Sequence, residues 1–341
     1  MNIERVFKGT ASLGRAFLEC RACLTDVYAR AKTVVVCPPD TPREFAVRCG
    51  GVPPTMFSIQ RNLFSAFFQA TYELLSVPEA RRHLYGRINY LFRIWVTAAD
   101  NLLDDEDKIV LDLRMPGDSH VMRQVVSIMA ADRVLHSLLE EAVQQNVITF
   151  AEAGYLSGAT LQVLLPSAAE EASEEKGVRQ RPKPEYVLET IHRIKTGLLF
   201  RVPLLGPENV EKHVDRARLA LCRDGLGDFG IGCQLLDDVR DIARDHLERR
   251  HNYVLSVLSQ ARDEQLKLKK MEKGIVVDKK LFKKFPTACS VTVKLAERYL
   301  RNGLLKLDQC GLGLGLERTE AIIRFLFKAL DVEEARVWSR S

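Results

Sequence analysis

Two stretches of the sequence begin almost wholly apolar and end almost wholly acidic, and together they constrain the chain more than any other feature. The first is NYLFRIWVTAADNLLDDEDK, at 89–108. The second is GIGCQLLDDVRDIARD, at 230–245. A segment that is apolar on all sides is typical of a buried helix rather than a surface helix. We therefore expect two buried helices, each of which ends in a cluster of carboxylates.

The spacing of these acids predicts that they gather on one side of each helix. Asp100, Asp104 and Asp107 fall within a narrow arc at about 100° per residue, and Asp237 and Asp241 share a face. Clustered carboxylates repel each other unless a cation lies between them, and a hard divalent cation prefers oxygen ligands. One acidic helix end is usually a solvated terminus. Two such ends, about 130 residues apart, favour a metal site.

Helical patterns cover nearly the whole chain. The only compact β-branched runs are 34–37 and 274–278, and 46% of the 341 residues are apolar, which is enough for one large core. We therefore expect an all-α protein with a single domain over 1–341. Helices are expected at 1–30, from about 57 to 77, 121–145, 150–165, 185–199 and 210–222, with two more in 287–338; loops are expected at 36–55, 111–120 and 167–184.

The sequence GLGDFG at 225–230 matches the GxGxxG pattern of dinucleotide-binding sites. That pattern indicates such a site only between a strand and a helix, and the residues before it are helical in pattern. We expect these small residues to allow close helix packing or to leave room for a ligand.

Composition excludes several classes of function. The net charge is +5 and no basic patch is interleaved with aromatic residues, so nucleic acid is not an expected partner. A mild positive balance suits an anionic small substrate. The eight cysteines lack the spacing of a zinc site, the N-terminus lacks the apolar core of a signal peptide, and the uncharged run 153–169 is too short and polar to span a membrane. We expect a cytoplasmic protein with reduced cysteines and no transmembrane segment.

Magnesium retains several waters and binds through a few carboxylates together with phosphate oxygens, so a diphosphate substrate suits the two acidic clusters. Cations for the remaining phosphate oxygens are available at Arg114, Arg193 and Lys195. Metal ions stabilise the charge that develops on a leaving group. These residues favour loss of diphosphate from an apolar allylic substrate.

These motifs resemble those of the class I isoprenoid synthases of the trans-polyprenyl diphosphate synthase superfamily. The segment FGIGCQLLDDVRD (229–241) is similar to the family's second aspartate motif, and KTGLL (195–199) resembles its diphosphate-binding lysine segment. DNLLDD (100–105) with LRMPG (113–117) resembles the first motif and the arginine-proline turn after it. The resemblance covers about 55–260, which leaves 1–55 as a peripheral N-terminal segment.

The sequence departs from the chain-elongating members of that family at several positions. Asn101 stands where a second aspartate is usual, and Leu113 replaces one of two arginines. The segment SIQRNLF (58–64) keeps Arg61 but lacks the other cations of the isopentenyl diphosphate site, and RRHNYVLS (249–256) replaces a Gly-Lys segment. We therefore expect a depleted pocket for a second diphosphate.

The resemblance implies a helical bundle around a central apolar cavity. It also implies that magnesium is the cofactor, with about three ions bound together with the substrate diphosphate. The main interpretation is a terpene synthase that ionises an allylic diphosphate of about 15 to 25 carbons. The implied metal ligands are Asp100, Asp104, Asp105, Gln234, Asp237, Asp238 and Asp241, with Asp100, Asp104, Asp237, Asp238 and Asp241 as the catalytic set. The implied diphosphate ligands are Arg61, Arg114, Arg193, Lys195, Arg249 and Arg250, and the implied cavity residues are Phe92, Trp95, Phe200 and Phe229.

Three alternatives remain open from the sequence. A prenyl-chain-elongating transferase would consume isopentenyl diphosphate, with Arg61 and Arg114 in a reduced pocket. A non-catalytic partner subunit of the same fold would release no diphosphate. A carboxylate di-iron bundle would need Glu-x-x-His pairs, which neither motif contains. A homodimer is also common in the family that the chain resembles.

Overall fold

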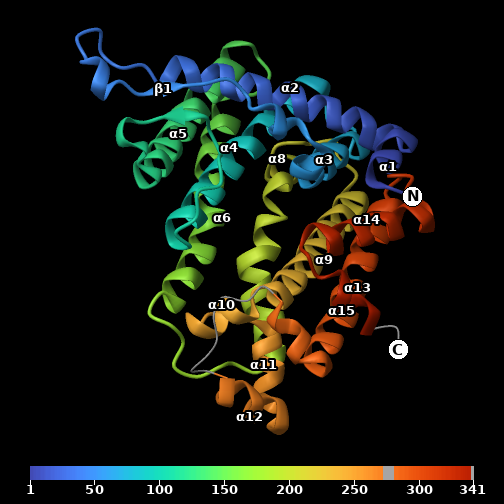
Figure 1. Cartoon of the computed structure of the whole chain (residues 1–341). Coiled ribbons are helices and arrows are strands. Elements are labelled where there is room, and N and C mark those ends of the chain that lie inside the picture. The colour runs from blue at the N-terminus through green and yellow to red at the C-terminus, as the bar shows by residue number, and fades with distance from the viewer. Residues whose placement is uncertain (272–279, 339–341) are drawn as a thin grey trace. The chain divides into compact units, whose positions relative to one another are not determined.

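The computed structural model describes residues 1–271 and 280–338, and these are helical almost throughout (Figure 1). The all-α prediction is confirmed. The β-branched run at 274–278 lies outside the described residues. The helices are α1 (Ile3–Gly9), α2 (Ala11–Val34), α3 (Ile59–Leu74), α4 (Glu79–Leu103), α5 (His120–Gln144), α6 (Phe150–Glu174), α7 (Pro184–Tyr186), α8 (Leu205–Asn209), α9 (Arg216–Arg240), α10 (Ile242–Leu247), α11 (Tyr253–Gln260), α12 (Arg262–Met271), α13 (Pro286–Gln309), α14 (Gly315–Ala329) and α15 (Glu333–Trp338).

Shorter elements connect these helices. Two π-helical segments, Val187–Ile191 and Arg193–Gly197, follow α7. Strands β1 (Arg48–Cys49) and β2 (Leu113–Arg114) pair antiparallel, with Arg48 opposite Arg114. Single 3₁₀ turns lie at Arg43–Phe45, Pro54–Phe57, Pro116–Asp118, Val202–Leu204 and Leu281–Lys284.

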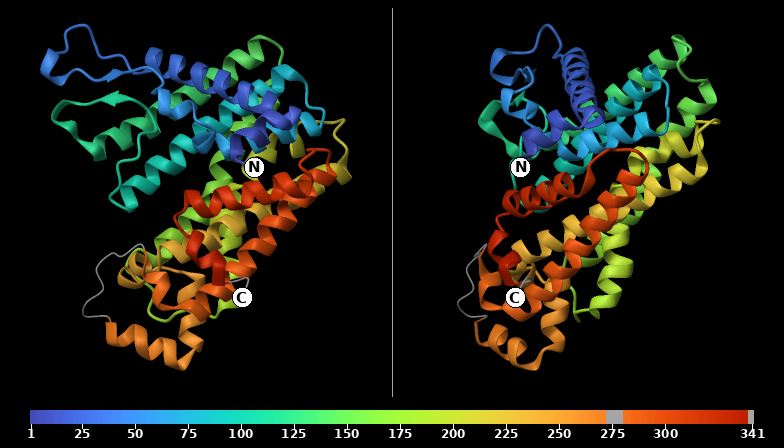
Figure 2. Two further views of the ribbon diagram at one scale, coloured as in Figure 1. Left: turned by 45° about the vertical axis from the view of Figure 1, so that its right-hand side comes forward. Right: turned by 90° about the vertical axis from the view of Figure 1, so that its right-hand side faces the viewer.

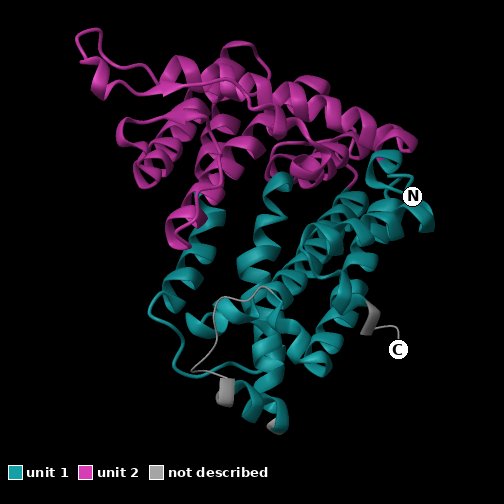
Figure 3. Cartoon of the chain, viewed as in Figure 1, with its two compact units in different colours: residues 1–6, 161–204, 216–341 teal, residues 7–160, 205–215 magenta. Residues whose placement is uncertain are grey.

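The chain divides into two compact units, which Figure 3 shows in different colours. Unit 1 comprises 1–6, 161–204 and 216–341, and unit 2 comprises 7–160 and 205–215. The first acidic stretch lies in unit 2 and the second lies in unit 1. The single domain expected from the sequence stays a prediction.

Unit 2 is built on α2, α3, α4 and α5, which pack on one another through their apolar faces (Figure 1). Tyr72 of α3 is fully buried and meets Tyr85 of α4 edge to face, with ring centroids 5.6 Å apart. Helix α4 begins after Pro78, whose fixed φ suits a helix start. Its first turn is charged and partly exposed, its buried residues begin at Leu84, and its acidic end reaches the unit's surface.

Unit 1 is built on α9, which packs along α13 (Figure 2). Glycines permit this close approach, because a Cβ at Gly232 would lie 2.7 Å from the Leu300 side chain. A Cβ at Gly303 of α13 would lie 2.6 Å from the Gly225 carbonyl oxygen. The GLGDFG segment is therefore part of a helix that packs closely, as expected, and lies in no strand–turn–helix unit.

Several predicted boundaries are wrong. Helix α6 continues to Glu174 through Pro166, where a loop was expected from residue 167. Proline removes one helical hydrogen bond, but the Ala- and Glu-rich residues after it are strong helix formers. The expected helix 210–222 begins only at Arg216 and continues without a break into the second acidic stretch, as far as Arg240, so both parts belong to α9. Residues 287–338 form three helices instead of two. Residues 1–30 form two helices, because the chain breaks at Thr10.

Candidate functional site

The first acidic stretch ends α4 in an open cluster of carboxylates. The helix stops at Leu103, and Asp104 closes it by donating its backbone N–H to the Asp100 carbonyl at 2.9 Å. Carboxylate oxygens of Asp100, Asp104 and Glu106 lie within 4.8 Å of one another. About half of the Asp100 side chain is exposed, so a hydrated cation can reach it. Oxygen ligands at this spacing fit a hard divalent cation such as magnesium.

Asp105 and Asp107 lie outside this cluster, because the helix has already ended. Asp105 adopts a φ of +51°, which turns the chain, and its carboxylate lies 3.1 Å from His120 Nε2. Asp107 binds Arg123 of α5 at 2.7 Å. The expected helical arc of Asp100, Asp104 and Asp107 is therefore wrong at its last member.

Asn101 holds the turn that carries these acids. Its side chain is fully buried, its Nδ2 donates to the Lys108 carbonyl at 2.8 Å, and its Oδ1 accepts from the Lys108 N–H at 3.2 Å. An aspartate there could accept but could not donate. Asparagine in place of the usual aspartate thus adds the hydrogen bond to the Lys108 carbonyl to this turn.

Lys108 supplies a cation inside the same cluster. Its Nζ lies 3.2 Å from Asp100 Oδ2 and also pairs with Glu106. Burial by itself lowers the pKa of Lys108, but the carboxylates of Glu106 and Asp100 raise it above its usual value. A lysine already occupies the position next to Asp100 at which a metal ion would neutralise the carboxylates.

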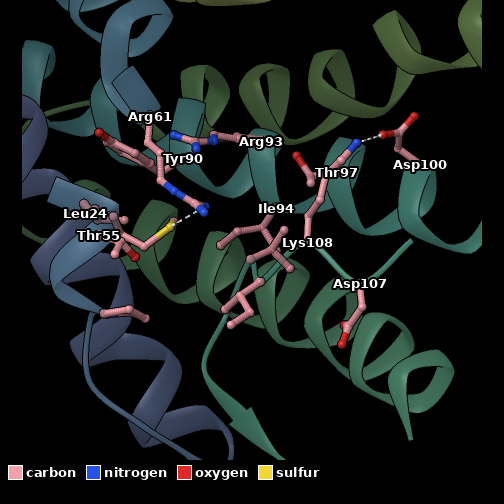
Figure 4. Close-up of a pocket in the computed structure, with 14 residues that line it drawn as sticks. Leu24, Thr55, Arg61, Tyr90, Arg93, Ile94, Thr97, Asp100, Asp107 and Lys108 are labelled. Atoms are coloured by element: carbon pink, nitrogen blue, oxygen red, sulfur yellow. Dashed lines mark hydrogen bonds and ion pairs between the residues drawn. The ribbon is translucent and has the colours of Figure 1, made fainter. Parts of the chain in front are cut away.

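A pocket of about 530 Å³ opens beside Asp100 within unit 2 (Figure 4). Arg61 of α3 and Arg93 of α4 both line it. Burial and the charge of Arg61 hold the pKa of Arg93 below its usual value. No carboxylate of the described residues pairs with either guanidinium; the Nη1 of Arg61 lies 3.5 Å from Met56 Sδ. The other lining residues are Leu24, Pro53, Thr55, Met56, Tyr90, Ile94, Thr97, Asp100, Asp107, Lys108, Ile109 and Val110.

Arg93 and Lys108 are functional candidates that the sequence reading missed. Arg93, Thr97 and Asp100 are spaced four and three residues apart on α4, so they share one face of that helix. This spacing was a usable signal. No sequence signal marked Lys108, because its approach to Asp100 depends on the turn that Asn101 holds.

Arg114 is placed elsewhere. It is exposed in β2, opposite Arg48 of β1, and is absent from the residues that line the pocket. Leu113 beside it is buried. The predicted role of Arg114 in diphosphate binding stays a prediction.

The second acidic stretch presents Asp237 and Asp241 at the end of α9. Arg240 Nη2 lies 2.7 Å from a carboxylate oxygen of each, and Arg244 Nη2 lies 3.3 Å from Asp241 Oδ2. Burial raises the pKa of Asp237 to about 6; Arg240 opposes the shift, and the neighbouring carboxylates of Asp241 and Asp238 add to it. The side chains of Arg240 and Arg244 are 30% and 27% exposed, and two neighbouring carboxylates at a partly exposed position also fit magnesium.

Asp238 differs from both of its neighbours. Only 1% of it is exposed, and its carboxylate accepts hydrogen bonds from His192 Nε2 at 2.8 Å, the Tyr253 N–H at 2.6 Å and Gln234 Nε2 at 3.0 Å. Gln234 in turn accepts a hydrogen bond from Thr196 Oγ1. The polar atoms of both residues have partners within the protein, and their predicted role as metal ligands stays a prediction.

Lys195 lies in a network of opposite charges in unit 1. Its Nζ lies 2.6 Å from Glu171 Oε1 and 2.9 Å from Glu174 Oε1. His251 pairs with Glu174 as well, at 3.1 Å. Although burial raises it, hydrogen bonds from His251 and the charge of Lys195 bring the pKa of Glu174 to about 2.

The other predicted cations of unit 1 are dispersed. Arg250 lies 3.3 Å from Glu171, at the edge of the Lys195 network. Arg249 adopts a φ of +57° and donates to the Lys176 carbonyl at 2.8 Å. Arg193 is exposed on its π-helical segment.

The predicted cavity residues form two aromatic pairs, one in each unit. Phe92 and Trp95 meet edge to face in unit 2, with ring centroids 6.4 Å apart, and Phe200 and Phe229 do so in unit 1 at 6.1 Å. None of the four lines the pocket beside Asp100. Their role as cavity walls stays a prediction.

Solved structures of prenyl diphosphate synthases resemble this chain over almost its whole length. A polyprenyl synthase from Caulobacter crescentus CB15, complexed with calcium and isoprenyl diphosphate, matches with a TM-score of 0.60 and 16% identity, over 95% of this chain and 98% of the other. A decaprenyl diphosphate synthase from Rhodobacter capsulatus matches with a TM-score of 0.59 and 14% identity, over 94% of this chain and 98% of the other. A geranylgeranyl pyrophosphate synthase from Lactobacillus brevis matches with a TM-score of 0.58 and 15% identity, over 93% of this chain and 98% of the other. No model of a protein family and no curated protein sequence matches the chain.

The chain therefore has the all-α fold of the class I isoprenoid synthases, as the resemblance of its motifs implied. The sequence identity to these solved structures is low, so the likeness establishes the fold only. The activity has to be inferred from the residues of the site. Among the described residues, no helix combines the length and apolarity needed to cross a membrane.

Proposed function

We propose that this protein is a magnesium-dependent prenyltransferase that joins an allylic prenyl diphosphate to isopentenyl diphosphate. The observation that carries the proposal is the pocket beside Asp100, which presents Arg61 and Arg93 without a carboxylate partner among the described residues. Two uncompensated guanidinium groups favour a multiply charged anion, and guanidinium binds phosphate oxygens through paired donors. The sequence reading expected this pocket to be depleted of cations, and Arg93 changes that expectation.

The size and lining of the pocket also suit a small diphosphate ester. A volume of about 530 Å³ falls within the range of small-molecule sites. Tyr90 and Thr97 add polar groups beside the arginines, whereas Leu24 and Ile94 supply an apolar wall for a five-carbon chain. A ligand held there lies next to Asp100, and so next to the first carboxylate cluster.

The carboxylates divide into two candidate sets of magnesium ligands. Asp100 and Asp104 would hold magnesium in unit 2, and Asp237 and Asp241 would do so in unit 1. Bound magnesium supplies positive charge to the leaving diphosphate of the allylic substrate. The allylic carbon–oxygen bond would break and release diphosphate, and the double bond of isopentenyl diphosphate would form a bond to the allylic carbon. One proton would then pass from the former isopentenyl unit to the released diphosphate.

Terpene synthesis is the second candidate, and the position of Arg114 favours it. In β2 this arginine is exposed and does not line the pocket, so the pocket holds fewer cations than the motif implied. Such an enzyme would ionise the allylic diphosphate without consuming isopentenyl diphosphate. The fold likeness to named prenyl diphosphate synthases supports the transferase better.

One incubation separates these functions. The purified chain is mixed with magnesium and an allylic diphosphate of each common length, with and without isopentenyl diphosphate, and products are analysed by mass spectrometry. Longer diphosphates that appear only with isopentenyl diphosphate support the transferase. A hydrocarbon or alcohol made without it identifies a terpene synthase. No magnesium-dependent product with any substrate points to a non-catalytic partner subunit.

We also propose a homodimer formed through α5 and the start of α6. Met122 and Met129 of α5 and Phe150 of α6 are exposed apolar side chains. Met122 and Met129 are seven residues apart and therefore lie on one face of α5, and an exposed apolar face is typical of a protein interface. Light scattering of the purified chain tests this, and the Met129→Glu variant is expected to shift a dimer toward monomer.

A further inference from the structure

Two helical segments of unit 1 are joined by polar contacts at a spacing of four residues. His192 Nε2 lies 2.8 Å from Asp238 Oδ2, and Thr196 Oγ1 donates to Gln234 Oε1. The numbers rise along one segment and fall along α9, so the two run antiparallel. Gln234 Nε2 also donates to Asp238 Oδ1 at 3.0 Å, which connects the two contacts into one network.

An apolar contact continues the same spacing. Phe200 packs on Gly230, where a Cβ would lie only 2.6 Å from the phenylalanine ring. The ring of Phe200 also meets Phe229 edge to face. The pairs 192–238, 196–234 and 200–230 therefore form three successive contacts, which we call the α9 ladder.

The ladder and the chain beside it occupy most of the acceptor positions of the Asp238 carboxylate. Its two oxygens accept three hydrogen bonds from the protein, one of them from the Tyr253 N–H at 2.6 Å, and 1% of the residue is exposed. Asp237 and Asp241 instead pair with Arg240, whose side chain is 30% exposed. Adjacent residues of one acidic motif thus have different partners.

His192 carries a second sign of this arrangement. Its side chain is buried, and its Nδ1 has no hydrogen-bond partner among the residues that the structure describes, while its Nε2 faces Asp238. An unpartnered buried nitrogen costs free energy and calls for an explanation. We explain the unpartnered Nδ1 by the contact on the other side of the ring: Nε2 holds Asp238 and thereby the register of α9.

We propose that His192, Thr196, Gln234 and Asp238 are positioning residues that set the register between the Lys195 segment and the Asp237–Asp241 pair. Lys195 lies between two rungs of the α9 ladder, and Asp237 lies next to Asp238. A slip of one residue in either helix would turn these side chains by about 100°. The inference rests on the proposed function, because register matters only if the metal and the diphosphate meet these residues.

The test counts Mn²⁺ ions bound by the full chain with inorganic diphosphate, using electron paramagnetic resonance. Asp237→Asn is expected to bind fewer ions than the wild type. Asp238→Asn and His192→Leu keep the ion count but weaken Mn²⁺ affinity about tenfold, whereas His192→Gln, which retains an N–H donor, stays within about threefold. The two weakening substitutions are expected to be non-additive when combined, because both break one contact.

The outcomes separate this inference from the proposed function. If the wild type binds no Mn²⁺ with diphosphate, the proposed function fails and the inference fails with it. If the wild type binds but Asp238→Asn loses as many ions as Asp237→Asn, Asp238 is a ligand and the inference alone is overturned. If His192→Leu does not fold, Thr196→Val provides the same comparison, and wild-type Mn²⁺ affinity in that variant overturns the inference.

Discussion

The two acidic stretches look alike in sequence, yet their carboxylates have different surroundings. At the end of α4, Asp100, Asp104 and Glu106 form an open cluster around Lys108. At the end of α9, Asp238 is buried and fully hydrogen-bonded by protein groups. A run of acids after an apolar helix therefore does not show by itself which acids face a ligand.

The difference arises from where each helix ends. Helix α4 stops before most of its acids, so the chain turns and spreads them, and the buried Asn101 holds that turn. Helix α9 continues through Asp237 and Asp238, so neighbouring acids point to different sides. One carboxylate then serves packing and the next remains available for a cation.

The largest expected effect comes from removing an available carboxylate in either stretch. Asp104→Ala and Asp237→Ala should each lower turnover about a thousandfold, because a lost metal ligand removes several kcal/mol of charge stabilisation. Folding should be kept, since fewer clustered acids repel less. Turnover is measured with magnesium and the substrates that the proposed incubation identifies. Asp118→Ala, an exposed acid of unit 2, is the matched control, and wild-type turnover in either test variant would refute the metal assignment.

A smaller effect is expected from the pocket. Arg93→Leu should raise the KM for isopentenyl diphosphate about 10- to 100-fold, because a hydrogen bond to a charged group contributes about 1.5–3 kcal/mol. Arg114→Leu is the control, since Arg114 does not line the pocket. Steady-state kinetics with varied isopentenyl diphosphate provide the measurement. An equal effect of both substitutions would contradict the pocket assignment.

The sequence predicted the all-α fold and the two acidic helix ends, because apolar periodicity and spacing are local properties. It also marked Asp100 and Asp104, which the structure places in one cluster with Glu106. Arg93 was not predicted, because cations were expected at the positions that match the motifs of the resembling family and not along one face of α4. Hydrogen bonds between distant segments, such as His192 to Asp238, depend on packing that no local pattern records.

The turn after α4 offers a test on stability. Asn101→Asp keeps the shape of the side chain but loses the donor to the Lys108 carbonyl, so we expect unfolding to become easier by about 1–3 kcal/mol. Urea denaturation of the purified chain measures this. Asn146→Asp, at the exposed end of α5, makes the same chemical change without that contact. If Asn101→Asp is as stable as the control, the amide does not hold the turn, and the contrast between the two motifs needs another cause.

The smallest expected effect concerns the charged network around Lys195, which includes His251 through its contact with Glu174. Burial lowers the pKa of His251, but the hydrogen bonds that His251 donates to Glu170 and Glu174 raise this pKa to about 9. A pKa raised in the folded state adds stability that is complete below about pH 6.5 and is lost as the pH rises through about 9. We expect this contribution to be about 1 kcal/mol, since part of the network is solvated. Thermal unfolding between pH 6 and 10 should therefore show a steeper loss in the wild type than in His251→Gln. Parallel curves would mean that His251 stays neutral in the fold, and that Lys195 and Arg250 balance the glutamates beside them.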